Sequence, residues 1–389
     1  MLLIYQEQVL RVAQHVAGLS LGQADILRRA MTKARNKKEF MSIYQDFING
    51  ALQRGLKKDQ AETIWQFLSQ FVGYGFNKAH SATYGTIAYQ TAFLKFYFPA
   101  EYMCAVLNNH GGFYSRMAYM EEARRLGISL LPPDINYSGR EFNCEGKAIR
   151  TGLNTVFELT ERTINRILQE RIRMPFQDLF DFINRSGAGE KEISHLIKCG
   201  ALSSLHPSAP QLLVLNKILF KNGKKKLVSE FVAGGTALSS YNLYQKVLNE
   251  LELLDCAVSA HPLTLFDDQI GWPEMVASTQ LENYKNQMIR FCGWLVTSRR
   301  VNTNKNQYMK FLTLEDKSGL CEAVLFSETY ARYGHLIRTH GPYIITGQVQ
   351  SRLPGEANLI AEKVELVEMN KSELEALLQK KTPPEWNQD

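Results

Sequence analysis

Cysteine motifs are missing from this sequence of 389 residues. No Cys-x-x-Cys pair occurs and no histidine lies at zinc-ligand spacing, so neither a zinc site nor a disulfide framework is indicated. A reduced, cytoplasmic environment is the simplest prediction. The six cysteines are scattered along the chain, at Cys104, Cys144, Cys199, Cys256, Cys292 and Cys321.

Long apolar runs are missing as well. No uninterrupted apolar segment approaches the length that crosses a membrane. The first residues, Met1–Ile4, are apolar, but they lack the charged start and the cleavage site of a signal peptide. We therefore expect a protein without a membrane partner.

A strong excess of one charge is also absent. The formal net charge is +6 and the isoelectric point is near 8.8, which is only mildly basic. Such a balance permits nucleic-acid binding without requiring it, so the distribution of the basic residues has to decide. The length predicts two to four domains.

What the sequence does contain is a dense mixture of polar, aromatic and glycine residues between Phe71 and Lys95. Two glycines flank Tyr74 and permit turn conformations that a side chain would disfavour. Lys78 and His80 follow at the expected start of a helix, where positive charge and free N–H groups suit an anion such as a phosphate. A capped, packed turn is the alternative interpretation of Tyr74 and His80.

Helical spacing dominates the first hundred residues. The pattern predicts a helix, a turn at Gly18–Ser20 and a second helix up to Met31, and two more helices between residues 39 and 70. The second helix ends in a basic cluster that runs to Lys38 and could equally be a solvated face. Four aromatic residues further on are predicted to be core, namely Phe93, Phe96, Tyr97 and Phe98.

The last large segment alternates with the period of β-strands. Five predicted strands lie between Ile289 and Val364, and a helix over Glu328–Ile337 separates the third from the fourth. This order describes an OB-fold barrel. Its ligand face carries cations and aromatic rings suited to single-stranded nucleic acid. That face also carries Lys310, and within it we favour Arg299, Arg300, Lys305 and Tyr308 over Trp294 and Phe311, because several members must fill the barrel.

Four linked motifs carry a family resemblance. In order and spacing, Tyr5–Val9, Ala24–Met31, Tyr74–Tyr84 and Tyr89–Lys95 resemble the fingers region of the bacterial DNA polymerase III alpha subunit. The resemblance implies that the residues facing the incoming dNTP are Arg28, Arg29, Lys33, Tyr74, Lys78 and His80. The family often has Gly-Lys-Lys after Ala-Met, whereas Thr32-Lys33-Ala34 stands here, so only Lys33 is carried over.

The carboxylates that nucleotidyl transfer requires are not recognisable. Such transfer uses two metal ions held by clustered carboxylates, and Asp25, Asp46, Asp59 and Glu101 form no Asp-x-Asp pair. The resemblance places the metal-binding aspartates in a palm domain before the fingers. We therefore expect no catalytic residue in this sequence, Mg²⁺ ligands outside it, and an upstream palm-containing piece, whether this is a split-gene product or a truncated sequence.

Residues 151–205 resemble the family's tandem helix-hairpin-helix region, in which N–H groups at a glycine turn bind a DNA phosphate. The turn expected to read Gly-x-Gly is Phe157-Glu158-Leu159 here. If the module binds DNA, Arg162 and Arg166 are the expected contacts. The alternative is a purely structural helical module that does not bind DNA.

The predicted protein is multidomain and mainly α, with helical fingers and a helix-hairpin-helix-like module before an all-β OB-fold barrel. The expected partners are template and primer DNA, single-stranded DNA and dNTPs; no Gln-containing clamp-binding peptide is found, so a sliding clamp and the replicative or error-prone branch stay open. The alternative function is a non-catalytic protein that binds single-stranded nucleic acid through the OB-fold. The expected boundaries are 1–110 for partial fingers, 111–150 for a connector with a hairpin at Glu145-Gly146, 151–205 for the module, 206–287 for a linker region, 288–368 for the OB-fold and 369–389 for a tail.

Overall fold

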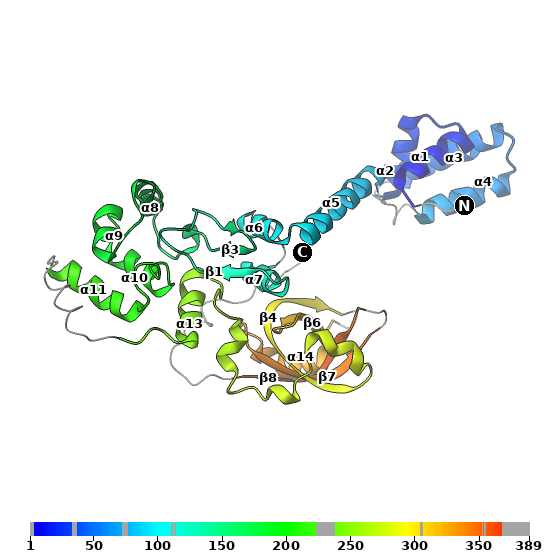
Figure 1. Cartoon of the computed structure of the whole chain (residues 1–389). Helices are drawn as coiled ribbons and strands as arrows, with labels where there is room; N and C mark the ends of the chain where they lie inside the picture. The colour runs from blue at the N-terminus through cyan, green and yellow to red at the C-terminus, as the bar shows by residue number, and fades with distance from the viewer. Residues whose placement is uncertain are drawn as a thin grey trace. The chain divides into compact units, whose positions relative to one another are not determined.

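The structure, a computed structural model, forms two compact units, Met1–Tyr97 and Phe98–Asp389 (Figure 1). Each unit is described by itself. The residues that the structure describes are 4–32, 37–71, 77–109, 112, 114–222, 238–303, 306–351, 353 and 355–367. The predicted tail and most of the lysine-rich part of the linker region lie outside these ranges.

The first unit is helical, as its apolar spacing predicts. Trp65 is its central aromatic residue and contacts the rings of Phe40, Tyr44 and Phe47 at centroid distances of 5.3–5.5 Å. A Cβ at Gly50 would overlap the carbonyl oxygen of Ala17, so glycine is required where two helices cross. The helices are α1 (Gln6–Ala17), α2 (Leu21–Thr32), α3 (Lys37–Gln53), α4 (Lys58–Phe71) and α5 (Lys78–Tyr97).

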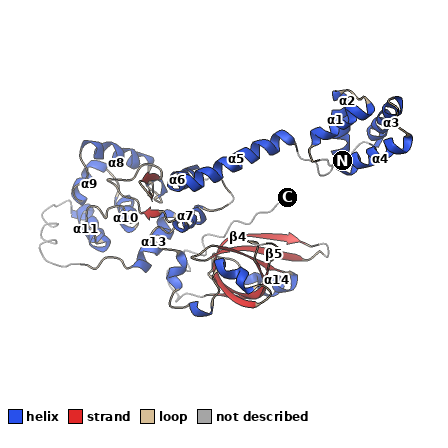
Figure 2. Cartoon of the chain, turned by 45° about the vertical axis from the view of Figure 1, so that its right-hand side comes forward, coloured by secondary structure: helices blue, strands red, loops and turns tan. Residues whose placement is uncertain are grey.

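Helix α5 is apolar yet has no buried residue. Figure 2 shows it as one continuous helix. The prediction that Phe93, Phe96, Tyr97 and Phe98 are core residues is wrong, because these side chains are 45–77% exposed. The apolar composition was interpreted correctly, but the described part of the chain does not cover this surface. Tyr84, Ile87, Tyr89 and Leu94 are exposed on the same helix.

The second unit begins with helices around a small sheet. The predicted hairpin at Glu145-Gly146 is confirmed, since β2 and β3 are antiparallel, and β1 adds to β3 in parallel. The sheet consists of β1 (Ser129–Leu131), β2 (Asn143–Glu145) and β3 (Ala148–Arg150). The helices are α6 (Pro99–Asn109), α7 (Arg116–Arg125), α8 (Glu161–Arg173), α9 (Leu179–Ser186), α10 (Glu190–Lys198), α11 (Ala209–Asn222) and α13 (Leu243–Leu254), with a short 3-10 turn, η1 (Leu153–Thr155), before α8.

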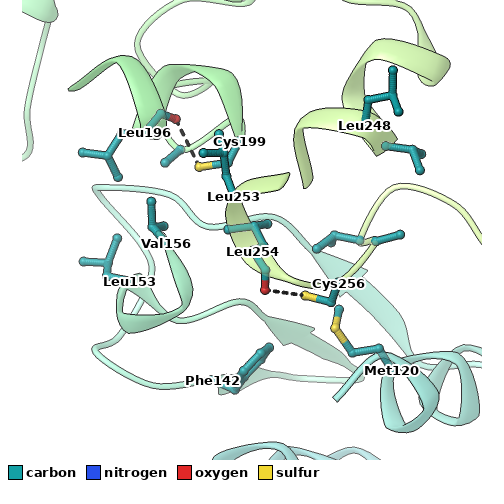
Figure 3. Close-up of a cluster of buried hydrophobic side chains, with 14 of the residues drawn as sticks. Met120, Phe142, Leu153, Val156, Leu196, Cys199, Leu248, Leu253, Leu254 and Cys256 are labelled. Carbon is teal, nitrogen blue, oxygen red and sulfur yellow. Dashed lines mark hydrogen bonds between the residues drawn. The ribbon is translucent and has the colours of Figure 1, made fainter. Parts of the chain in front are cut away.

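A shared apolar core joins these helices and contains four of the cysteines, Cys104, Cys199, Cys256 and Cys292. Figure 3 shows the thiols of Cys199 and Cys256 donating hydrogen bonds to the carbonyl oxygens of Leu196 and Leu254. Burial raises the pKa of the Cys199 thiol to about 12. None of the six cysteines is in a disulfide. These thiols therefore act as small core side chains.

The closed β-barrel confirms the OB-fold prediction. Its strands follow the order β4-β5-β6-β8-β7, with β6 and β8 parallel, and a helix stands between the third and fourth strands. The barrel elements are β4 (Met288–Asn302), β5 (Tyr308–Glu315), β6 (Leu320–Leu325), α14 (Ser327–Tyr333), β7 (Tyr343–Gln350) and β8 (Asn358–Leu366). Four 3-10 turns accompany them, η2 (Pro262–Phe266), η3 (Trp272–Glu274), η4 (Ser278–Tyr284) and η5 (Gly334–Leu336).

Candidate nucleotide and nucleic-acid sites

The basic residues expected at the triphosphate lie at the end of α2. Arg28 and Arg29 are helical, and the guanidinium of Arg29 pairs with Asp25 one turn earlier, at 2.5 Å. Arg29 is two-thirds exposed, so this pair stabilises the helix little and leaves the cation accessible. The side chain of Arg28 and all of Lys33 lie outside the described residues.

The start of α5 is capped from two directions. Asn77 Oδ1 accepts the backbone N–H of His80 at 2.9 Å, which is an ordinary N-cap. The backbone N–H of Lys78 instead donates to both carboxylate oxygens of Glu7, at 2.9 and 3.1 Å. The sequence predicted an anion at this helix start, and the structure places a carboxylate of the same chain there. Tyr74 lies outside the described residues.

The side chains of Lys78 and His80 remain exposed beside that cap. The ring of His80 lies 4.4 Å from the ring of Tyr84, one turn further along α5. Helix α1 packs on α2 and also carries Glu7, so one helix contacts both segments that the sequence predicts to bind a dNTP. The structure therefore connects the two segments through α1.

Two arginines of the helix-hairpin-helix-like module, Arg162 and Arg166, are predicted to contact DNA. Arg162 is exposed on the first turn of α8. Arg166 Nε donates to the carbonyl oxygen of Arg185 at 2.8 Å, near the end of α9, so part of its guanidinium serves helix packing. A Gly-x-Gly sequence does occur in this module, at Gly187–Gly189 between α9 and α10, where Gly187 has φ 63°.

The first hairpin turn is closed by acidic side chains. Glu158 adopts φ 57°, the left-handed region that favours glycine, and its carboxylate pairs with Lys191 at 2.5 Å. Glu192 accepts the N–H and the hydroxyl of Thr160 at 2.9 and 2.8 Å, and the hydroxyl of Thr163 at 3.0 Å. Burial opposes ionisation of Glu192, but these donors and the N–H of Gly189 hold its pKa below the usual value. The turn is therefore held by bonds from Thr160, Thr163 and Lys191 to carboxylates of the same chain.

The β4–β5 ribbon carries the predicted single-strand contacts. Arg300 pairs in register with Lys310 and its guanidinium lies 4.8 Å from the ring centre of Tyr308, which is half exposed. Arg299 is exposed on the other face of the ribbon. Lys305 lies outside the described residues.

The two residues ranked lower on this face, Trp294 and Phe311, and the unranked Lys310 are buried or half-buried. Trp294 is only 4% exposed and stacks on His340 with ring centres 5.8 Å apart, outside the barrel interior. Lys310 is 3% exposed, and Phe311 is half-buried. β4 has a register shift between Leu295 and Thr297. The strand stays buried through Ser298 and is exposed at Arg299 and Arg300. The decision to favour Arg300 and Tyr308 agrees with their exposure.

A buried charge cluster, which the sequence did not reveal, joins α7 to the barrel. Arg125 donates to Glu315 of β5 at 2.6 Å and to Glu122 at 3.0–3.1 Å. The neighbouring Arg124 donates to Glu121 at 3.1 Å. Neither Glu121 Oε1 nor Glu315 Oε2 has a hydrogen-bond partner within the described ranges. Burial raises the pKa of Glu315 to about 8, and the negative charges of Glu121 and Asp316 add to this shift. The hydrogen bond and the positive charge of Arg125 oppose it.

Metal ligands were not predicted in this sequence. In the ranges given above, no group of three or more His, Cys, Asp and Glu side chains could hold a metal ion. The described residues therefore do not fit a two-metal polymerase centre, and we derive no chemical step through one.

The helices were also searched for membrane spans. None of those in the described ranges is both long and apolar enough to cross a bilayer.

Comparison with protein families matches three regions in order. Residues 2–55 match the bacterial DNA polymerase III alpha subunit finger domain, residues 127–212 a helix-hairpin-helix motif, and residues 289–367 an OB-fold nucleic acid binding domain. The helix-hairpin-helix match begins inside the expected connector.

Curated relatives match along most of the chain. The DNA polymerase III subunit alpha of Borreliella burgdorferi is 34% identical over 86% of this chain and 31% of its own length. That of Thermus aquaticus is 32% identical over 89% and 30%, respectively. An error-prone DNA polymerase of Symbiobacterium thermophilum is 28% identical over 94% and 38%. The chain thus spans about a third of the length of these relatives, and it belongs to the bacterial DNA polymerase III alpha subunit family.

Proposed function

We propose that these residues form the dNTP-facing fingers and the DNA-contacting modules of a DNA-directed DNA polymerase, a nucleotidyltransferase of DNA replication or repair synthesis. The observation that carries this proposal is the order of the three matched regions, fingers, helix-hairpin-helix and OB-fold, in one chain. Relatives named DNA polymerase III subunit alpha match this chain over more than four-fifths of its length. Because the chain spans about a third of their length, the activity itself belongs to a larger enzyme.

The proposed dNTP contacts combine exposed polar side chains with a flat ring. Arg29, Lys78 and His80 are exposed, and the cations of arginine and lysine neutralise charge that develops on a leaving pyrophosphate. Arg28, Lys33 and Tyr74 stay in the proposal on the family resemblance alone. Because Glu7 occupies the N–H of Lys78, we expect the triphosphate to contact the side chains of Lys78 and His80 rather than that N–H.

The proposed partner of the fingers is the upstream palm-containing piece. Helix α5 supports this proposal because the described part of the chain leaves its aromatic side chains exposed. An apolar surface of this kind is suited to contact with another protein segment. That piece would also supply the ligands of Mg²⁺, the ion that we propose for the complete enzyme. An adjacent upstream reading frame that ends in an Asp-x-Asp palm would support this arrangement. We propose a cytoplasmic location, in agreement with six cysteines that form no disulfide. A sliding clamp remains a candidate partner, although no clamp-binding peptide is recognised in the sequence.

The proposed DNA contacts divide between two modules. The β4–β5 ribbon presents a cation beside an exposed ring, a pairing that stacks bases and attracts the backbone of a single strand. The helix-hairpin-helix module contributes Arg162 and, with one bond already made, Arg166. A second candidate function is non-catalytic binding of single-stranded nucleic acid. The observation that favours it is the Arg300–Tyr308 pair on the β4–β5 ribbon.

Replacing Tyr308 by alanine is expected to weaken binding of an oligothymidine by about tenfold or more, because base stacking on an aromatic ring contributes ~1–3 kcal/mol. Fluorescence anisotropy at several salt concentrations measures this affinity. Arg300→Ala should weaken binding and also reduce its salt dependence. Tyr137→Ala is the matched control, since Tyr137 is 62% exposed and lies against Arg150 on the helical part of the unit. Equal affinity of the Tyr308→Ala variant and the unmodified chain would remove the ribbon from the proposed interface.

A further inference from the structure

The motif Tyr5–Val9 contributes to the family resemblance, but nothing so far gives its polar side chains a role. Gln8 Oε1 accepts the backbone N–H groups of Ile4 and Tyr5 at 2.7 and 2.8 Å, so Gln8 closes the start of α1. Glu7 does not take part in this cap. Its two carboxylate oxygens accept the backbone N–H of Lys78, which is 71 residues further along the chain.

This hydrogen bond is favourable on two physical grounds. The acceptor is charged, and a hydrogen bond to an ionised group is roughly twice as strong as a neutral one. The donor is the first N–H of a 20-residue helix, where the helix dipole concentrates partial positive charge. Both grounds favour a carboxylate at this position over a neutral side chain.

The contact is important for α5 because the helix has few other constraints at this end. Asn77 makes the other bonds described there, and they are local, to His80 N–H and to the hydroxyl and N–H of Ser81. No residue of α5 is buried. The Glu7 carboxylate is therefore the described contact that ties the first turn of α5 to another helix of the unit.

We propose that Glu7 is a positioning residue that fixes the first turn of α5, and with it Lys78 and His80, relative to α1 and the arginines of α2. Helix α1 is suited to this role because it packs on both α2 and α3. The inference rests on the proposed function, since Lys78 and His80 must face the dNTP for their position to affect its use. Glu7 touches neither substrate nor metal in this account.

The test compares three variants, Glu7→Ala, Glu7→Gln and the control Glu62→Gln. Glu62 lies on α4 and forms only an exposed pair with Lys58, at 4.0 Å. The first readout is hydrogen exchange of the Lys78 and Ser81 amides, measured by NMR on the full chain. The second is primer extension after the upstream palm-containing piece is added, which yields KM for the dNTP and kcat separately. Circular dichroism confirms that each variant is folded.

We expect Glu7→Ala to accelerate exchange of the Lys78 amide about tenfold or more and to raise KM for the dNTP by a similar factor, with a smaller change in kcat. Glu7→Gln retains an oxygen acceptor but loses the charge, so both of its effects should lie between those of Glu7→Ala and the unmodified chain. Glu62→Gln should change neither.

Unchanged exchange in Glu7→Ala would overturn the proposal, because the anchor would then not exist in solution. Accelerated exchange with an unchanged KM would overturn the positioning role. If the unmodified chain supports no extension with the added piece, the proposed function fails instead, and the exchange data still decide whether Glu7 anchors α5. If Glu7→Ala does not fold, Glu7→Gln is compared with Glu62→Gln. Faster exchange of the Lys78 amide together with a higher KM in Glu7→Gln supports the anchor, and equal values in the two variants contradict it.

Discussion

Replacing Arg125 by methionine is expected to destabilise the second unit by about 3–5 kcal/mol, because it leaves the Glu315 carboxylate buried without its partner. Glu315 is 1% exposed and accepts one hydrogen bond from Arg125 at 2.6 Å, while its other oxygen has no partner in the described ranges. Methionine preserves much of the volume of the arginine stem, so loss of packing contributes little. Urea unfolding at pH 9, above the pKa of about 8 that burial gives Glu315, measures the change.

The matched control for that substitution is Arg173→Met. Arg173 pairs with Glu170 on α8, but its side chain is 78% exposed, so the pair stabilises the unit by at most a few tenths of a kcal/mol. A loss below about 1 kcal/mol in Arg125→Met would contradict the buried-pair account. It would show that Glu315 is neutral or hydrated in the folded chain even at pH 9.

Replacing Glu315 by glutamine is expected to change how stability depends on pH. The pKa of Glu315 is raised by burial from 4.5 to about 8 in the folded chain. Between these values the folded state binds more protons than the unfolded state, so the free energy of unfolding falls as pH rises, and it levels off above about 8. Glutamine keeps the acceptor for Arg125 and removes the titration.

The stability of Glu315→Gln relative to the unmodified chain should therefore rise by ~2–4 kcal/mol between pH 5 and pH 9. Comparison of the two proteins at each pH cancels the contribution of Glu121, whose pKa burial also raises. Glu322→Gln, on an exposed residue of the same barrel, is the control. A pH-independent difference between Glu315→Gln and the unmodified chain would mean that Glu315 keeps an ordinary pKa.

The elements with local patterns were predictable from the sequence. Alternating apolar residues gave the five barrel strands and the helix between the third and fourth, and the Glu145-Gly146 turn gave the small hairpin. Each of these signals lies within a few consecutive residues. Strand order in the barrel follows from the recognised fold.

The contacts that organise the sites were not predictable, because they join distant residues. Arg125 and Glu315 are 190 positions apart, and Glu7 and Lys78 are 71 apart. No local pattern selects one carboxylate among many for such a pair. For Glu7, the signal available was its place in the first of the four motifs of the family resemblance.

The error on α5 has a different cause. Apolar composition shows that Phe93 and Phe96 need a covering surface, but it does not show which polypeptide provides it.

The first hairpin turn is a third case. Its missing glycines were visible in the sequence. The hydrogen bonds that Thr160 donates to Glu192, which close the turn, depend on how α10 packs.

The exposed surface of α5 and the family comparison lead to the same central claim. We propose that these residues supply dNTP and DNA contacts to a polymerase whose carboxylates lie on another polypeptide segment. Residues predicted to face the dNTP, such as His80, should then affect nucleotide use more than DNA binding.

Primer extension with a templated oligonucleotide, dNTPs and Mg²⁺ tests this claim most directly. We expect no extension by the chain alone, extension when the upstream palm-containing piece is added, and a higher KM for the dNTP in the His80→Ala variant with unchanged DNA affinity. Extension by the purified chain alone would contradict the account, as would an equal loss of dNTP use and DNA binding in His80→Ala.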